Sequence, residues 1–367
     1  MVNEISCITQ IHIKNFRCFN ERVIHFDAPV VLIQGANGTG KTSVLEALYY
    51  ASYLRSFRSA NPRELIADDA DSFFIKVLVK GMDIDHHDEI NVGFSQEKRL
   101  IKVNQQTVAS YKELMSYYSV ISVTEDDLAL IKEGPLYRRD FLDQALALND
   151  AEYVSLFKQM RETLETRNAA LQNQNVQQGS NALYVIWTQQ LWERSLAVQA
   201  KRIHFLQRIQ DEVNALIAHY FASDFEIILT YEPKRMRHAE SFAAFQARYP
   251  DLFQDELRFR RSLFGAHLDD ILITFKGKKS RTFASRGQQK LVLILIKAAQ
   301  IRLLLAHQKR PLVLLLDDFM TDFDLERTHL LIGMLADLKV QLIFTTPIGG
   351  YLEQGLANTP HQLVKLD

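Results

Sequence analysis

The feature that most constrains the fold is a glycine-rich run between an apolar stretch and a helical pattern. The run is Gly35, Ala36, Asn37, Gly38, Thr39, Gly40, Lys41 and Thr42. Residues 28–34 before it are apolar and β-rich, and residues 43–50 after it have apolar side chains at helical spacing. Glycines let the backbone curl so that successive N–H groups point at phosphate oxygens, and the helix start adds its positive dipole end. The run therefore predicts a nucleoside triphosphate site, with Lys41 on the β- and γ-phosphates and Thr42 on Mg²⁺.

Composition sets wide limits on the rest of the molecule. A chain of 367 residues, 47% of them apolar, can bury one large core or two linked cores. Its formal charge of −1 neither indicates nor excludes a nucleic-acid partner, because a local basic face is enough. Only two cysteines are present, which indicates a protein of the reducing cytosol rather than one whose fold depends on disulfides. No apolar run approaches the eighteen or so residues of a membrane span, so we expect a cytoplasmic protein without a membrane partner.

The order of the patterns places a helical segment inside an α/β protein. Strand patterns dominate the first part, and long helical patterns then run from Arg138 to about Leu171 and from about Asn181 to Ala222, around a polar turn at 173–180. We expect an antiparallel helical hairpin, which either only packs or forms an arm that contacts a partner. The predicted division is 1–127 for the first part of the head, 128–262 for the helical arm and 263–367 for the second part of the head. A His and Asp cluster at 83–88 predicts a polar hairpin tip rather than a metal site.

A second apolar run, Leu312 to Leu316, ends in Asp317 and Asp318. A continuous apolar run of this length is typical of a central parallel strand covered on both faces. In a triphosphatase, Asp317 would orient the Mg²⁺ shell and Asp318 would position or activate the attacking water. Thr345 ends the last predicted parallel strand, where a polar residue could sense the γ-phosphate.

Between the glycine-rich run and the two acids lies the segment Phe283 to Lys290, followed at once by an apolar helical pattern. It resembles the signature motif of ABC-type ATPases, in which a Ser, a Gly and a Gln at a helix start contact the γ-phosphate held by the opposite subunit. The matching residues are Ser285, Gly287 and Gln288. A hydroxyl and a helix N-terminus are good anion donors. The simpler interpretation is that Ser285 only caps the helix.

Nearly the whole chain resembles the RecF family, bacterial recombination and repair ATPases related to SMC heads. Beyond the motifs above, the resemblance rests on Ile13 to Arg17, Leu45 to Tyr50, Arg55 to Arg58, Asp127 and Leu128 with Gly134 and Pro135, Arg138 to Asp143, and Gly265 to Asp270. The chain departs from the family pattern at Glu125, Asp126, Ala266, Leu268 and Thr321 to Phe323. These departures keep size or charge in part, so they concern interface details more than ATP binding.

The resemblance implies an ABC-type P-loop ATPase head that forms an ATP-dependent homodimer, with two ATP molecules between the subunits. One subunit would bind each ATP through residues 35–42, Arg17 and Thr345, and the other through Ser285, Gly287 and Gln288. Thr42 and Asp317 would hold Mg²⁺, Lys41 and Asp318 would be catalytic, and Asp324 would lie at the dimer seam. Hydrolysis would be slow and stimulated by DNA.

The resemblance also implies binding to DNA at gaps or single-strand/double-strand junctions, and action with RecR and RecO to load the recombinase RecA. No base-reading motif is visible, so we expect contacts to the DNA backbone without sequence preference. The candidate donors are Lys276, Lys278, Lys279 and Arg281 on a predicted hairpin, together with Arg258, Arg260 and Arg261. Ordinary solvated charges would give the same pattern.

Three other classes share the phosphate loop. An ABC-headed nuclease or defence protein would add a separate acidic metal-dependent module, whereas only residues 347–367 follow the last predicted strand. A structural SMC-like ATPase would need much longer arms than the predicted 128–262 insert. A small-molecule kinase would leave the segment from Ser285 to Lys290 unexplained.

Overall fold

The computed structural model describes residues 7–80, 87–95, 98–108, 114, 117–172, 181–236, 241–307, 310–348 and 351–367. The chain forms two compact units, Met1–Asp127 with Gln308–Asp367, and Leu128–His307. Most of the predicted hairpin tip at 83–88, and the whole predicted turn at 173–180, lie outside the described residues. No described helix is long and apolar enough to cross a membrane.

The first unit contains a five-stranded parallel sheet in the order β14-β3-β13-β12-β8. Its strands are β3 (Val30–Gly35), β8 (Ser119–Val123), β12 (Leu312–Leu316), β13 (Gln341–Thr346) and β14 (Gln362–Leu366). Every residue of β3, β12 and β13 is buried, as expected for parallel strands covered on both faces. Because parallel strands end at one edge of a sheet, Gly35, Asp317 and Thr346 come to the same edge.

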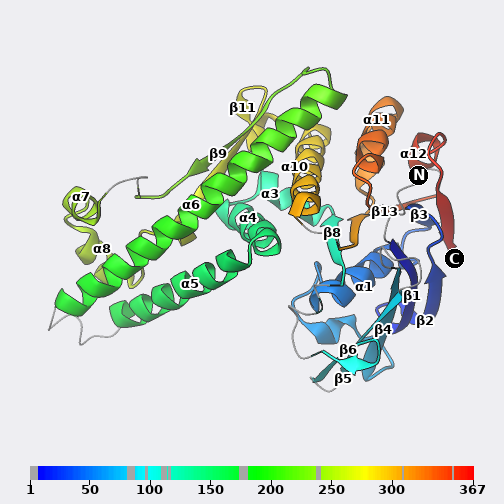
Figure 1. Ribbon diagram of the computed structural model, residues 1–367, viewed down its shortest axis with the longest axis horizontal. Helices are drawn as coiled ribbons and strands as arrows, with labels where there is room; N and C mark the ends of the chain where they lie inside the picture. Colours follow the sequence, from blue (N-terminus) through cyan, green and yellow to red (C-terminus); the bar gives the residue numbers. More distant parts are fainter. Residues whose placement is uncertain are drawn as a thin grey trace. The chain divides into compact units, whose positions relative to one another are not determined.

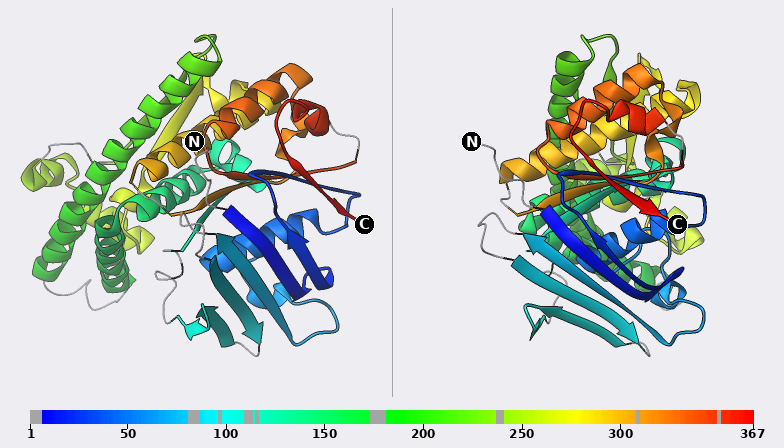
Figure 2. Two further views of the ribbon diagram at one scale, coloured as in Figure 1. Left: turned by 45° about the vertical axis from the view of Figure 1, so that its right-hand side comes forward. Right: turned by 90° about the vertical axis from the view of Figure 1, so that its right-hand side faces the viewer.

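A six-stranded antiparallel sheet accompanies it, in the order β2-β1-β4-β5-β6-β7 (Figure 2). Its strands are β1 (Cys7–Phe16), β2 (Phe19–His25), β4 (Ser72–Lys80), β5 (His87–Ser95), β6 (Lys98–Val103) and β7 (Gln106–Thr107). Strands β1 and β2 pair in an antiparallel ladder, with Ile13 opposite Arg22. The two sheets are joined at Gln341, whose buried amide accepts from the Ile8 N–H at 2.8 Å and donates to the Ile8 carbonyl at 2.9 Å.

Helix α1 (Lys41–Tyr53) begins directly after the glycine-rich run and lies between the two sheets (Figure 1). It contacts β3, β8 and β13 on one side and β1, β4 and β5 on the other. Nearly all of its side chains are buried, because a helix between two layers has no solvent face. The remaining elements of this unit are η1 (Pro62–Leu65), η5 (Phe319–Asp322), α11 (Leu325–Ala336) and α12 (Tyr351–Gly355), with the turn η2 (Asp126–Leu128) at its boundary.

The second unit is mainly helical. Its helices are α3 (Ala129–Lys132), α4 (Pro135–Asn149), α5 (Ala151–Gln172), α6 (Asn181–Tyr220), α7 (Phe242–Arg248), α8 (Leu252–Phe259), η4 (Ala266–Leu268), α9 (Ser280–Phe283) and α10 (Arg286–His307). A three-stranded antiparallel sheet completes it, with β9 (Ile227–Glu232), β10 (Asp270–Phe275) and β11 (Lys278–Lys279). Helices α5 and α6 run antiparallel and side by side, as the predicted hairpin requires (Figure 1).

Helix α10 extends this unit beyond the predicted arm of residues 128–262. Its long apolar surface is buried, and it packs on α6 and α4. Residues 263–307 therefore form one compact body with the arm, whereas the sequence predicts them to belong to the second part of the head. The physical reason is that α10 is apolar around most of its circumference and is covered by helices far away in the sequence.

A buried ion pair joins the α5–α6 hairpin to helix α8. The Arg167 guanidinium donates to Glu256 at 3.1 and 2.5 Å, and both side chains are almost completely buried. Arg167 also donates to the hydroxyls of Thr188 and Ser262 at 3.1 and 2.7 Å, and Tyr184 donates to Glu256 at 2.7 Å. These buried polar groups hydrogen-bond one another, so the network fixes α5, α6 and α8 in one arrangement.

Candidate functional site

The glycine-rich run forms a tight loop between β3 and α1. Gly38 and Gly40 have φ values of 90° and 91°, a left-handed conformation that favours glycine. At Gly40 a Cβ would come within 2.5 Å of the Phe19 ring and 2.6 Å of the Cys18 sulfur, so no larger residue fits without a shift. The buried Lys41 ammonium curls back onto the loop and donates to the Gly35 and Ala36 carbonyls at 3.0 Å each.

Two threonines bracket the first acid at the edge of the parallel sheet. The Thr42 hydroxyl lies 2.9 Å from both carboxylate oxygens of Asp317. The Thr345 hydroxyl lies 2.9 Å from Asp317 Oδ1 and accepts from the Asp318 backbone N–H at 2.8 Å. The structure thus brings together three predicted site residues, which come from α1, from the position directly after β12 and from β13. Asp318 has a φ of 47°, so the chain leaves the strand through a sharp left-handed turn at the second acid.

The environment of Asp317 suits a cation. Burial raises the pKa of Asp317, and the neighbouring Asp318 carboxylate raises it further, while Thr345, Thr42 and the Arg58 charge lower it in part. A buried carboxylate with a raised pKa and a hydroxyl oxygen beside it form a hard-oxygen donor pair, which fits Mg²⁺. Among the described residues no group of three or more His, Cys, Asp or Glu could hold a metal. Mg²⁺ bound through Thr42 and Asp317 would take its remaining oxygen ligands from water and phosphate.

Removing the negative charge of Asp317 should stabilise the protein without nucleotide. Because its folded pKa lies above the ordinary value, the ionised form costs free energy at every pH above the unfolded pKa. We therefore expect Asp317→Asn to raise the melting temperature of the ligand-free protein at pH 8 by ~2–4 °C and to abolish Mg²⁺-dependent nucleotide binding. In the parent, Mg²⁺ affinity should fall as the pH drops through the raised pKa. Differential scanning fluorimetry between pH 5 and 8 measures both effects, and a lower melting temperature for Asp317→Asn would contradict this account.

Arg17, which the resemblance placed on ATP, is paired with a buried acid. Its guanidinium donates to Glu46 at 2.8 and 2.7 Å and to the Glu64 carbonyl at 2.9 Å. Glu46 lies on α1, and its side chain is fully buried. Ser56 hydrogen-bonds the same carboxylate, and Arg58 lies 4.0 Å from it. Glu46 is not among the predicted site residues, although an acid inside the buried helix that follows the phosphate loop could have indicated it.

Asp324 occupies a helix start in the same unit. Its carboxylate accepts from the Arg327 N–H at 2.8 Å and thus caps α11. The loop before it contains η5, and its Thr321 hydroxyl donates to the Asp318 carbonyl at 2.9 Å. The segment predicted for the dimer seam is therefore tied to the second acid.

The signature residues lie in the second unit, at the start of α10. The Ser285 hydroxyl accepts from the Gln288 N–H at 3.3 Å, and the Ser285 N–H donates to Gln288 Oε1 at 2.9 Å. This reciprocal arrangement is a capping box, so the capping role of Ser285 is confirmed. Ser285 is exposed and Gly287 is half-buried, which leaves the helix start accessible. Capping and binding an anion from a second subunit are therefore compatible.

The predicted basic hairpin is present between β10 and β11. Lys276 and Gly277 have φ values of 51° and 72°, which is the two-residue turn that joins antiparallel strands tightly. Lys276, Lys278 and Lys279 are exposed, and so is Arg281 on α9. Their charges face solvent at one end of the three-stranded sheet, as a backbone contact with DNA would require.

Together these observations define the class of the protein. A phosphate loop leads into a helix between two sheets, and the adjacent parallel strands end in Asp317, Asp318 and Thr345. The second unit supplies a capped Ser-Arg-Gly-Gln helix start. This is the architecture of an ABC-type ATPase head, and the predicted α/β fold class is confirmed.

The chain belongs to the RecF/RecN/SMC N-terminal domain family, whose model matches residues 7–364. Within that family it is of the RecF type. It is 29% identical over 343 residues to the DNA replication and repair protein RecF of Geobacter metallireducens, covering 92% of each chain. It is 28% identical over 355 residues to the RecF of Clostridium acetobutylicum, covering 96% of this chain and 95% of that protein.

Solved structures agree with this assignment. The ATP-bound recombination mediator RecF of the RecFOR pathway superposes with a TM-score of 0.80 and 25% identity, covering 94% of this chain and 93% of that one. An Smc head domain from Pyrococcus furiosus superposes with a TM-score of 0.57 at 14% identity, covering 96% of this chain and 92% of that chain, and shows the shared fold.

Proposed function

We propose that this chain is an ATP-dependent, DNA-binding recombination mediator of the cytosol. The observation that carries the proposal is the cluster of Thr42, Asp317 and Thr345 beside the phosphate loop. Relatives of matching length are named DNA replication and repair proteins, and a solved relative holds ATP, which supports the same function here. The proposal includes slow hydrolysis stimulated by DNA, action at gaps or strand junctions, and RecR and RecO as partners.

In this proposal Lys41 changes partners when ATP binds. Its ammonium, which donates to the Gly35 and Ala36 carbonyls, would instead donate to the β- and γ-phosphates, so that the buried charge would stay hydrogen-bonded. Thr42 and Asp317 would hold Mg²⁺, which would neutralise phosphate charge. Asp318 orients the attacking water, and its backbone is held by the hydroxyl of Thr345, which hydrogen-bonds Asp317 as well. Arg17 would have to exchange Glu46 for a phosphate to reach the nucleotide.

The second half of the site would come from a second copy of the chain. Ser285, Gly287 and Gln288 would contact the γ-phosphate held by the partner, and Asp324 would lie at the seam. ADP lacks the group that both copies would contact, so ATP and ADP would differ in their affinity for the closed dimer. Hydrolysis would then release DNA held through backbone contacts from Lys276, Lys278, Lys279 and Arg281.

The test is the mass of the protein by light scattering with and without ATP and Mg²⁺. We expect a monomer-to-dimer shift for the parent, a persistent dimer for Asp318→Asn, and no shift for Lys41→Met. Loss of a charged hydrogen-bond donor should weaken ATP binding by roughly 10–150-fold. If Lys41→Met dimerised and bound DNA like the parent, the proposal would be wrong. Cleavage of linear or nicked DNA by the parent with Mg²⁺ or Mn²⁺ would instead favour a nuclease.

A further inference from the structure

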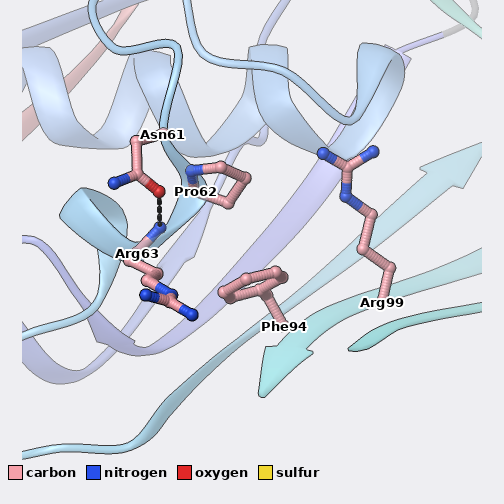
Figure 3. Close-up of a pocket in the computed structure, with 5 residues that line it drawn as sticks. All are labelled: Asn61, Pro62, Arg63, Phe94 and Arg99. Atoms are coloured by element: carbon pink, nitrogen blue, oxygen red, sulfur yellow. Dashed lines mark hydrogen bonds between the residues drawn. The ribbon is translucent and has the colours of Figure 1, made fainter. Parts of the chain in front are cut away.

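A pocket of about 690 Å³ lies in the first unit and belongs to none of the motifs above. It is lined by Asn61, Pro62, Arg63, Phe94 and Arg99. Figure 3 shows the Pro62 and Phe94 rings between the two arginine side chains. The volume is in the range of pockets that hold small organic molecules, roughly 300–1,000 Å³, and is too large for a lone phosphate.

One wall of the pocket is built by a capped turn. Asn61 precedes η1, and its Oδ1 accepts from the Arg63 N–H at 3.1 Å, the bond drawn in Figure 3. Pro62 occupies the first position of the turn, where its fixed φ suits the helical geometry. The backbone that carries Arg63 is thereby held in place, while its side chain is exposed.

The opposite wall comes from the antiparallel sheet. Phe94 of β5 and Arg99 of β6 are directly opposite each other in the ladder, so their side chains share one face. Phe94 is 7% exposed and stacks on Phe73 with ring centroids 6.0 Å apart, so the Phe94 ring is held in place at the floor of the pocket. Arg99 is exposed, and its charge lowers the pKa of Tyr50 against the larger effect of burial.

The chemistry of these walls selects an anion that carries a planar apolar group. Guanidinium groups match phosphate oxygens, and apolar rings accept the face or edge of a base. In a nucleic-acid strand each base branches from a sugar that lies between two phosphates, so two cations on either side of an apolar floor match one nucleotide and its flanking phosphates. Bases of a duplex are stacked and paired, so only an unpaired nucleotide can enter such a pocket.

We propose that this pocket binds one nucleotide of single-stranded DNA, with its base against Pro62 and Phe94 and its flanking phosphates on Arg63 and Arg99. The inference rests on the proposed DNA-binding function and deepens it, because it assigns the single-stranded part of the substrate to a named place. An acidic peptide would satisfy the arginines but has no group that corresponds to the base. The two ligands are separated by the test.

The experiment measures binding of a fluorescent oligo(dT) by anisotropy as a function of salt. The variant is Arg63→Gln/Arg99→Gln, with Arg99→Gln alone as the milder change. Lys98→Gln is the matched control, because Lys98 is exposed, adjacent in the same strand and on the opposite face, and loses the same charge. We expect the double variant to bind at least ~10-fold more weakly, with a log–log salt slope smaller by about 1.4, since each single-strand phosphate contact contributes about 0.7.

A second probe tests the base. An abasic oligonucleotide of the same length should bind the parent roughly 5–150-fold more weakly than oligo(dT), because stacking is lost. The proposal is overturned if Lys98→Gln weakens binding as much as Arg99→Gln, if the abasic strand binds like oligo(dT), or if the double variant binds like the parent. A glutamate-rich peptide that displaces no oligo(dT) but binds in an arginine-dependent way would assign the pocket to a protein partner.

Failure of this inference and failure of the proposed function give different results. ATP-dependent dimerisation without pocket-dependent binding of oligo(dT) would remove the pocket and leave the ATPase function standing. Pocket-dependent binding of oligo(dT) without ATP-dependent dimerisation would support the nucleotide pocket and contradict the proposed ATP-dependent function. Melting curves of the variants ensure that a loss of binding is not a loss of fold.

Discussion

An equimolar mixture of Lys41→Met and Ser285→Arg chains is expected to hydrolyse ATP, although neither variant does so alone. In a symmetric dimer of either variant both composite sites are defective. A mixed dimer contains one site with an intact phosphate loop and an intact partner Ser285. Each mixed dimer has one of its two sites whole. Random assortment would make half of the dimers mixed, and the failure of Lys41→Met chains to dimerise with one another favours mixed dimers further, so about a quarter to a half of the parent rate should return.

The substitution at Ser285 also removes one half of the capping box of α10. Loss of the cap should lower the free energy of unfolding by about 1 kcal/mol, and this effect must be separated from the loss of the contact between subunits. Thr282→Arg is the matched control, since Thr282 is exposed on the neighbouring helix α9 and gains the same charge and bulk. The composite site would be refuted if Ser285→Arg alone kept the parent rate, or if the mixture stayed inactive while both chains melted normally.

Glu256→Ala is expected to destabilise the helical unit by about 3–5 kcal/mol, because it leaves the Arg167 guanidinium buried without its carboxylate. Both side chains are at most 1% exposed, so bulk solvent does not reach the guanidinium in the parent. The chain contains two tryptophans, Trp187 and Trp192, and both lie in α6. Urea unfolding followed by tryptophan fluorescence therefore reports on this unit selectively.

Two further variants sharpen the measurement. Arg161 pairs with Glu165 on the exposed face of the same helix α5, so Arg161→Ala should cost only about 0.3–0.5 kcal/mol. Arg167→Met/Glu256→Leu removes both buried charges and should be less damaging than Glu256→Ala alone. Equal stabilities for Glu256→Ala and Arg161→Ala would show that the buried pair does not hold the hairpin together.

The nucleotide site was predictable in its local parts. Residues 35–42, the start of α1 and the capping box of Ser285 with Gln288 are formed by neighbours in the chain. The two acids were predictable because an apolar run that ends in charges marks a buried strand reaching the edge of a sheet. The basic hairpin was predictable from the same alternation of strand and turn residues.

What only the tertiary structure decided depends on contacts across long separations in the chain. Thr42 lies 275 residues from Asp317, and the sheet register together with the loop that leads from β3 into α1 brings them within 2.9 Å. No regular spacing in the sequence predicts that Arg17 pairs with Glu46 or that Arg167 pairs with Glu256. A buried charge pairs with whichever opposite charge the packing places beside it. The same holds for Arg63 and Arg99, which reach one pocket from a turn and a strand. The sequence by itself determined the elements and the phosphate loop, whereas packing determined which side chains face one another.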